Sequence, residues 1–476
     1  MSALDLSSLA PELALTLTGI LVLLLEAFIP ATRRLATPLT VAGTLIAGWL
    51  ALGLAPGMSF GGQLEASGKT LIFSLVVLVS TGLTAIASEG FLRRERIPVA
   101  EYQAMILWAA VGMLLMVRAQ ELLTIFVCLE LFSICLYALA AFHRQVSWSL
   151  EAAIKYFLMG AFVSSFVLLG IGIVYGETAS TSLSDLAQSL EAGIGSRSLL
   201  TLALLLLIAG FGFKMSLVPF HAWSPDTYQG APSPFVAFLS VAPKVASAFV
   251  MLRLLEILGS NALGDKWPQL IGILAVLSMV LGNLLALVQR DIKRMLAYSG
   301  IAHMGYVAIA LARPTDTAWA PVAVYLLAYA LMNAGAFAAV ALLYRKAGEP
   351  SQISELAGYG YRYPVLGACL AVSMLSLGGI PPTFGFIGKY MVFLHAIENG
   401  ALSLAIVGVV ASLVGVFYYL RVVYTLYMKP EGETETLVLD GWGRVAALLA
   451  AAATLVLGVW PGGLLRWMFD AVAGAS

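Results

Sequence analysis

The chain has 476 residues, of which 61% are hydrophobic and 11% charged, and its mean hydropathy is +0.94. A soluble protein carries about twice this share of charged residues, so the composition excludes an ordinary soluble domain and predicts a polytopic membrane protein. The formal net charge is zero, which argues against a nucleic-acid or polyanion partner.

Apolar runs of about 18 or more residues predict an all-α fold with about fourteen transmembrane helices. The expected spans are residues 10–29, 38–54, 70–88, 103–117, 121–141, 154–175, 199–218, 233–255, 269–288, 295–312, 319–343, 364–395, 402–427 and 443–460. The first run lacks a basic leading segment and a small-residue cleavage site, so we expect a membrane helix there and not a cleaved signal.

The basic residues between these spans predict the orientation of the chain. If the N-terminus lies outside, fifteen Lys and Arg residues fall in inside loops, Arg345 and Lys346 among them, and seven fall at outside ends. Cytoplasmic loops carry such an excess of positive charge. The distribution therefore supports an even number of spans with both termini outside.

Four lysines remain, and all of them fall within spans: Lys155, Lys214, Lys244 and Lys389. A charge in hydrocarbon is costly and marks a functional site. Lysine can lose its proton when it is desolvated, whereas arginine effectively cannot, so buried lysines suit reversible proton carriage. Snorkelling from a helix end is the alternative, and for Lys155, near the start of its span, both explanations stand.

Glu130 lies in the middle of the span 121–141. An ion pair with Lys214 would limit the cost of burying both charges, and each group would alter the proton affinity of the other. If Lys244 competes for the same proton or partner, the pair can open and close as an element of a pump. The alternative is a static buried ion pair.

Two spans are interrupted by helix-breaking residues next to a lysine. In residues 210–234, Pro219 follows Lys214 and is followed by His221. In the second span, residues 378–382 read GGIPP and precede Lys389. Irregular backbone at membrane depth is tolerated where protein or water satisfies it, and it is typical of ion-translocating proteins.

The interrupted spans are the seventh and the twelfth, which predicts two inverted five-helix repeats made of spans 4–8 and 9–13. In this scheme Glu130 corresponds to His303, Lys214 corresponds to Lys389, and Lys244 lies between the two sets. The expected domains are an N-terminal three-helix segment, a first and a second repeat, and a loop with a C-terminal helix, at residues 1–100, 101–257, 258–428 and 429–476.

His303 lies well inside the tenth span, with Tyr298, Ser299 and Tyr306 nearby in sequence. A buried histidine can relay protons because it both donates and accepts. A lone buried histidine is more often a structural group, and both explanations stand for His303. His221 is a weaker candidate, at the loop end of the first interrupted helix.

Several segments resemble the antiporter-like membrane subunits of respiratory complex I, and among them the subunit N type. They read LEAAIKYFLMGAF, FKMSLVPFHAWSPDTYQGAPSP, RDIKRMLAYSGIAHMGY and SLGGIPPTFGFIGKY, and the likeness runs from about residue 100 to about residue 425. The form FHAWSPDTYQGAPSP favours subunit N over subunits L and M and over the multisubunit sodium/proton antiporters.

The resemblance implies roles for particular residues. Glu130 and Lys214 match the glutamate–lysine pair of the family on helices 5 and 7. Lys244 matches its central lysine, and Lys389 matches the ionisable residue on broken helix 12. Lys155 and His303 lie in matching segments, where a relay role is less defined.

The resemblance also implies a proton-translocating subunit of the enzyme NADH:quinone oxidoreductase, with the redox chemistry in other subunits. We expect no cofactor in this chain, since its three cysteines lie in apolar segments without a CxxC motif: Cys128, Cys135 and Cys369. Expected partners are an M-type subunit and small K-, J- and A-type subunits in a bacterial inner membrane, with both termini periplasmic. The alternatives are a sodium/proton antiporter subunit and a passive scaffold.

Overall fold

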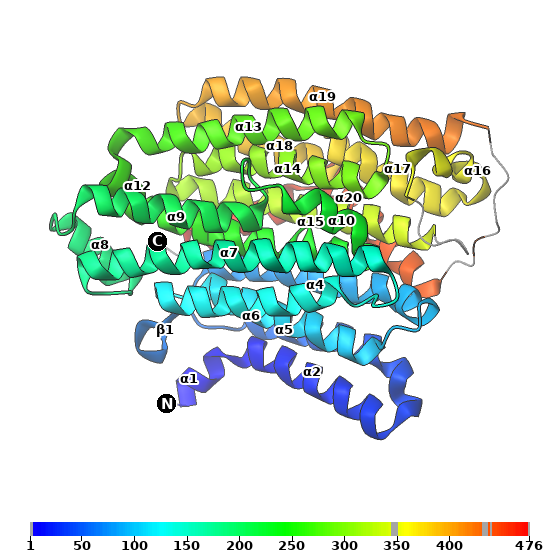
Figure 1. Ribbon diagram of the computed structural model, residues 1–476, viewed down its shortest axis with the longest axis horizontal. Coiled ribbons are helices and arrows are strands. Elements are labelled where there is room, and N and C mark those ends of the chain that lie inside the picture. Colours follow the sequence, from blue (N-terminus) through cyan, green and yellow to red (C-terminus); the bar gives the residue numbers. More distant parts are fainter. Residues whose placement is uncertain (1–2, 344–350, 431–436, 438–439, 475–476) are drawn as a thin grey trace.

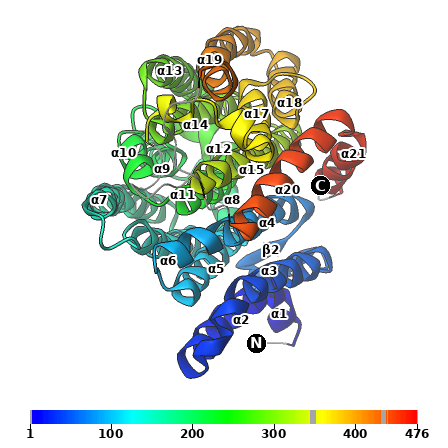
Figure 2. The same cartoon turned by 90° about the vertical axis from the view of Figure 1, so that its right-hand side faces the viewer.

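The computed structural model describes residues 3–343, 351–430, 437 and 440–474, so Arg345 and Lys346 lie outside the described residues. Long helices lie side by side along one direction of the molecule (Figure 1). Seen along that direction, the bundle is elongated, with the N-terminal helices at one end and the helices of the second half at the other (Figure 2). The expected all-α membrane fold is confirmed.

Each expected span coincides with one helix or with a pair of helices. The single helices are α2 (Ala10–Phe28), α3 (Ala36–Leu52), α4 (Gly68–Arg94), α5 (Val99–Arg118), α6 (Leu122–Ala140), α7 (Ser147–Thr178), α9 (Arg197–Met215), α13 (Trp267–Val288), α14 (Ile292–Leu311), α15 (Trp319–Leu342), α19 (Leu402–Met428) and α20 (Gly441–Val459). The pairs are α11 (Ser233–Leu239) with α12 (Ala242–Leu263), and α17 (Pro364–Gly378) with α18 (Phe384–Glu398).

Twelve segments in the described part of the chain are long and apolar enough to cross a membrane. Helix α14 and the pair α17 and α18 are not among these twelve, although they lie within the same bundle (Figure 1). The count of fourteen spans, the inverted repeats and the four domain boundaries therefore stay predictions.

The two predicted interruptions are confirmed, and they end their helices in the same way. Helix α9 is followed by Ser216 in the left-handed conformation, at φ 61°, and the next amide, Leu217 N–H, donates to the carbonyl of Gly212. Helix α17 is followed by Gly379 at φ 77°, and Ile380 N–H donates to Leu375. This six-residue closure satisfies carbonyls that the broken helix would otherwise leave unpaired.

Several short elements are too brief or too polar for the hydropathy pattern to predict. They are a hairpin of β1 (Gly57–Ser59) and β2 (Leu64–Ala66), the helices α1 (Ala3–Ser8), α8 (Leu183–Glu191), α10 (Trp223–Gly230), α16 (Tyr359–Arg362) and α21 (Gly462–Ala473), and the 3₁₀ turns η1 (Pro30–Leu35), η2 (Phe60–Gly62), η3 (Gly264–Lys266), η4 (Asp316–Ala318) and η5 (Ile353–Leu356). Helix α10 follows the first interruption and packs against α7 and α14.

The centre of the bundle is formed by the pair α11 and α12 with α14 and α15, whose residues are almost all buried. The outer helices α2, α7, α13 and α19 instead expose large apolar side chains, such as Leu17, Ile154, Val288 and Phe417. Such exposure suits contact with lipid. The central layer is therefore the part of the chain most shielded from both water and lipid.

Both termini lie at the end of the bundle that carries β1 and α8 (Figure 1). The starts of α2 and α4 and the ends of α3 and α5 come together there around one cavity. The side of the membrane on which this end lies stays a prediction from the basic residues of the sequence.

Candidate functional site

Lys214 lies in the last turn of α9, just before the interruption, and its side chain is buried. Its Nζ donates to Ser133 Oγ at 2.7 Å and to Tyr137 OH at 3.3 Å, both on α6. The rings of Phe132 and Tyr156 lie 5.6 and 5.7 Å from the same Nζ. The ammonium is thus held by two hydroxyl groups and by aromatic faces that attract a cation.

Glu130 is half-buried on α6, one turn before Ser133, but the contacts of Lys214 within the described residues do not include the expected ion pair with it. In the described part of the chain its Oε1 is buried without a hydrogen-bond partner. Ser133 and Tyr137 lie further along the same helix and reach Lys214 first, since residues three and four apart share a helix face. The pair is therefore close in the fold but open in this structure.

Lys244 lies in the first turn of α12 and is fully buried. Within the described residues its Nζ has no hydrogen-bond partner. The rings of Tyr228 and Tyr329 each lie 5.8 Å from it. A methyl group added at Gly300 of α14 would lie 3.2 Å from Lys244 Nζ and 2.7 Å from Tyr329 OH, so the glycine makes room for both.

Lys389 lies in α18 and folds back onto the broken end of α17. Its Nζ donates to the carbonyl oxygens of Leu377 and Gly378 at 3.0 and 3.1 Å, and to Ser412 Oγ of α19 at 2.7 Å. A cation at the C-terminal carbonyls of a helix is stabilised by the helix dipole. The interruption of the twelfth span thus builds the binding site of this lysine.

His303 is buried in α14 and is hydrogen-bonded through both ring nitrogens. Its Nδ1 lies 2.6 Å from Tyr325 OH of α15, and its Nε2 lies 2.9 Å from Tyr419 OH of α19. The same Tyr419 hydroxyl is hydrogen-bonded to Ser299. The imidazole therefore bridges hydroxyl groups on two neighbouring helices, an arrangement through which a proton can pass.

Aromatic side chains connect these groups into one continuous set. Tyr329 lies between Lys244 and His303, 5.8 Å from the ammonium and 5.1 Å from the imidazole. Tyr306 lies between His303 and Lys389, at 5.7 and 5.2 Å. We refer to Lys214, Lys244, His303 and Lys389, with the side chains that connect them, as the buried row.

The buried row reaches Lys214 through a second set of stacked rings. Tyr228, which faces Lys244, contacts Trp223 with ring centroids 6.3 Å apart. Trp223 stacks on Tyr156 at 4.6 Å, and Tyr156 faces Lys214. The first and second interrupted helices are thus joined through the centre of the bundle.

Lys155 lies outside the buried row, half-exposed at the other end of the bundle from the hairpin. Its Nζ contacts Glu151 at 2.7 Å and Asp226 of α10 at 2.9 Å, while Arg294 of α14 contacts Asp226 at 2.6 Å. Burial raises the pKa of Asp226, but the hydrogen bonds from Arg294 and Lys155 outweigh it and hold this pKa below its ordinary value.

His221 is half-buried in the loop of the first interruption, and within the described residues its Nδ1 has no hydrogen-bond partner. The structure therefore brings four of the seven predicted site residues into the buried row. Glu130 lies beside the row, Lys155 lies in a charged cluster at one end, and His221 joins neither set.

Sequence reasoning missed the neutral partners: Ser133, Tyr137, Tyr228, Tyr329, Tyr325, Tyr419 and Ser412. One signal was available, because Glu130, Ser133 and Tyr137 are spaced three and four residues apart and so share one face of a helix. The partners on other helices carry no such signal, since only the packing of α15 and α19 against α14 brings them to His303.

Comparisons with known proteins agree with this architecture. The family described as "NADH:quinone oxidoreductase/Mrp antiporter, TM" matches residues 119–415. The chain is 39% identical to NADH-quinone oxidoreductase subunit N of Trichlorobacter lovleyi, over 98% of this chain and 97% of that protein. The chain is thus similar to subunit N relatives over nearly its whole length.

Two solved structures are similar to the chain at different levels. A chain of respiratory complex I from Thermus thermophilus with bound aureothin matches with a TM-score of 0.81 and 34% identity, covering 96% of this chain and 98% of that one. A chain of the Mrp complex from Dietzia sp. DQ12-45-1b matches with a TM-score of 0.83 but 19% identity, covering 100% and 98%, which shows a shared fold alone. The chain therefore belongs to the subunit N family of NADH-quinone oxidoreductase, within the wider family of antiporter-like transmembrane subunits.

Proposed function

We propose that this chain, as a membrane subunit of an NADH:quinone oxidoreductase, translocates protons along the buried row. The observation that carries the proposal is the continuity of Lys214, Lys244, His303 and Lys389 through aromatic and hydroxyl side chains, with Lys244 and His303 in the most shielded layer of the bundle. A scaffold that only filled the membrane would gain nothing from three such costly lysines.

Lys244 is the central switching group in this proposal. An ammonium only donates hydrogen bonds, and Lys244 Nζ has no acceptor within the described residues. Protonation of Lys244 therefore requires hydration of its pocket or a movement of Tyr228 or Tyr329 toward it. That requirement couples the charge on Lys244 to the conformation of α10 and α15.

Lys214 and Lys389 lie on either side of Lys244 in the buried row, each beside an interrupted helix. Lys214 is held by hydroxyl groups that can be exchanged for the nearby Glu130, and closing that pair would draw the ammonium away from the row. Lys389 is held by the end carbonyls of α17, so its contacts change if the break between α17 and α18 moves. A coupling route needs such two-state elements.

Of the remaining site residues, His303 is part of the buried row, whereas Lys155 and His221 lie outside it. Lys155 lies in the charged cluster at the inner end, where protons would arrive, and His303 relays between the centre and Lys389. His221 is at most a hydrated group near the first interruption.

We also propose that the redox chemistry takes place in other subunits and that no cofactor binds to this chain. Its partners would be an M-type antiporter-like subunit and small K-, J- and A-type subunits of the same complex. The location would be a bacterial inner membrane, with both termini periplasmic. The fifteen-to-seven asymmetry of basic residues supports this orientation.

The test is Lys214→Ala in membranes that contain the whole complex, with assembly checked by native gel. We expect the complex to assemble while proton pumping and quinone-reductase activity fall together, because one buried carrier is lost. Lys429→Ala, an exposed lysine after α19, is the control and should keep both activities. Redox activity that never depends on this chain would instead favour the sodium/proton antiporter alternative.

A further inference from the structure

A second polar site lies far from the buried row, in a cavity of about 260 Å³ at the hairpin end of the bundle. Its walls come from the starts of α2 and α4, the ends of α3 and α5, and the last turns of α21. This volume is several times the roughly 30 Å³ that one water occupies in the liquid. The cavity can therefore hold a group of several heavy atoms.

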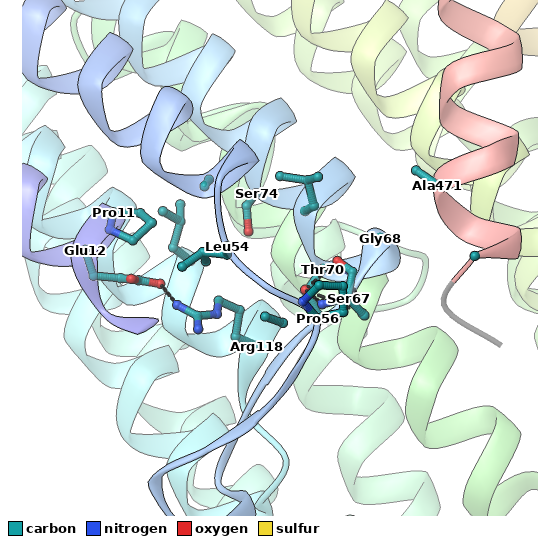
Figure 3. A pocket seen from close by; sticks show the side chains of 15 residues that line it. Pro11, Glu12, Leu54, Pro56, Ser67, Gly68, Thr70, Ser74, Arg118 and Ala471 are labelled. Atoms are coloured by element: carbon teal, nitrogen blue, oxygen red, sulfur yellow. Dashed lines mark hydrogen bonds and ion pairs between the residues drawn. The ribbon is translucent and has the colours of Figure 1, made fainter. Parts of the chain in front are cut away.

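The cavity contains a buried ion pair. Arg118, the last residue of α5, contacts Glu12, in the first turn of α2, with Nη1 and Oε1 2.7 Å apart (Figure 3). Arg118 also donates to the carbonyl oxygens of Ser8 and Glu65. Both side chains of the pair are 4% exposed, so the arginine is fixed in place by three separate contacts.

One polar atom of each charged group is left without a hydrogen-bond partner within the described residues, and both residues line the cavity. Within the described residues, Arg118 Nη2, Glu12 Oε2 and Ser74 Oγ are all buried without a hydrogen-bond partner. All three residues line the cavity, with Ser74 on the wall formed by α4 (Figure 3). Unpartnered buried polar atoms are costly. A ligand that offers an acceptor to Nη2 and a donor to Oε2 would satisfy both.

The depth of the cavity points to lipid. Four membrane helices begin or end at its walls, which puts it at the level of the headgroups. Helix α21 closes one side, burying Met468 and Val472 while it exposes Trp467, and Trp460 just before it is also exposed. Tryptophans on an amphipathic helix are typical of the membrane–water interface.

We propose that this cavity binds the headgroup of a zwitterionic phospholipid with a primary ammonium, a phosphatidylethanolamine. The phosphate accepts from Arg118 Nη2, and the ammonium donates to Glu12 Oε2. A choline headgroup has no N–H to donate, and a glycerol headgroup places an uncompensated negative charge beside Glu12. The bound lipid would join α2, α3 and α21 to the rest of the bundle. This proposal does not depend on the proposed proton route.

The test uses the whole complex, delipidated in detergent and then exposed to mixed micelles of phosphatidylethanolamine, phosphatidylcholine or phosphatidylglycerol. Lipid retained after washing is measured by mass spectrometry. We expect phosphatidylethanolamine to be retained about tenfold better than the other two, since charge-assisted hydrogen bonds are the strong ones. Equal retention of the three lipids, as expected if water alone fills the cavity, would overturn the proposal, and so would a preference for phosphatidylglycerol.

Two variants make the test specific. Glu12→Gln keeps the acceptor for Arg118 Nη1 but replaces Oε2 with an N–H donor, so the preference for phosphatidylethanolamine over phosphatidylcholine should disappear. Ala51→Leu fills the cavity from α3 and should abolish retention of all three lipids at this site. This variant tests whether the cavity binds lipid even if the complex with Glu12→Gln does not assemble. Glu191→Gln, an exposed carboxylate at the end of α8, should behave as the wild type. A preference that survives in both cavity variants would place the lipid elsewhere.

Discussion

The three lysines of the buried row are held in three different ways. Lys214 donates to hydroxyl groups, Lys389 donates mainly to the carbonyls at a helix end, and Lys244 has no acceptor within the described residues. An unpaired buried charge costs more than a hydrogen-bonded one. Lys244 is therefore the group whose protonation depends most on rearrangement of its surroundings.

The hydroxyl that holds Lys214 gives a first prediction. In Ser133→Ala the ammonium keeps only the longer contact to Tyr137, and loss of a hydrogen bond to a charged group is worth about 1.5–3 kcal/mol. We expect coupled proton pumping to fall by about tenfold or more while the complex assembles. Ser164→Ala, which removes a buried hydroxyl without a partner in the described residues, should keep full activity. If both variants pumped protons equally well, Ser133 would have no part in proton translocation.

The space around Lys244 gives a second prediction. Gly300→Ala places a methyl group 2.7 Å from Tyr329 OH and 3.2 Å from Lys244 Nζ, so one of the two side chains must move. Alanine is about 1 kcal/mol better than glycine in a helix interior, so any loss of pumping would come from the site and not from α14. We expect pumping to fall severalfold. Gly172→Ala on α7, with no atom within 4 Å of the added carbon, is the matched control and should pump normally.

Both interrupted helices end in a residue with the left-handed backbone conformation, but the residue type at that position differs. After α9 the left-handed position is occupied by Ser216, and after α17 it is occupied by Gly379. The left-handed conformation costs an L-residue about 1–2 kcal/mol, whereas glycine adopts it freely. The first interruption therefore stores backbone strain beside Lys214, and the second does not.

Substitutions at these two positions should change the thermal stability of the complex in opposite directions. Ser216→Gly relieves the strain and removes a buried hydroxyl without a partner in the described residues, so we expect the thermal stability of the complex to rise slightly. Gly379→Ala adds strain and places a carbon 2.9 Å from Lys389 Cδ, so both stability and pumping should fall. Thermal unfolding of the purified complex and pumping in vesicles measure the two quantities. A rise in stability for Gly379→Ala would contradict this account of the second interruption.

The whole molecule has two chemically distinct ends. The hairpin end carries both termini, α8 and the cavity with Glu12 and Arg118 (Figures 1 and 3). The opposite end carries the charged cluster of Lys155, Asp226 and Arg294. Helix α7, with 32 residues, spans between the two ends, and at about 1.5 Å per residue it is long enough to cross a bilayer with some excess.

This arrangement predicts which residues a membrane-impermeant thiol reagent can reach. Glu191→Cys at the end of α8 should be labelled from the periplasmic side, and Arg144→Cys in the loop before α7 should be labelled only from the cytoplasmic side. Both positions are exposed, and the three native cysteines are buried, so the background should be low. Labelling of intact cells and of inverted vesicles measures the difference. The reverse pattern would overturn the proposed orientation of the termini.

The sequence by itself determined the membrane class, the approximate helix boundaries and three of the buried lysines, Lys214, Lys244 and Lys389. These features follow from long apolar runs, from helix-breaking residues and from the cost of a charge in hydrocarbon. They are local properties, so a single segment such as residues 210–234 carries them without reference to the rest of the chain.

Only the tertiary structure decided what surrounds each charged group. The expected contact of Glu130 with Lys214 is replaced by Ser133 and Tyr137, and His303 acquires partners from α15 and α19. The ion pair of Glu12 and Arg118 joins residues 106 positions apart in the chain. Side-chain partners on different helices depend on the rotation and crossing of those helices, and hydropathy fixes which residues are apolar but not which helix faces meet.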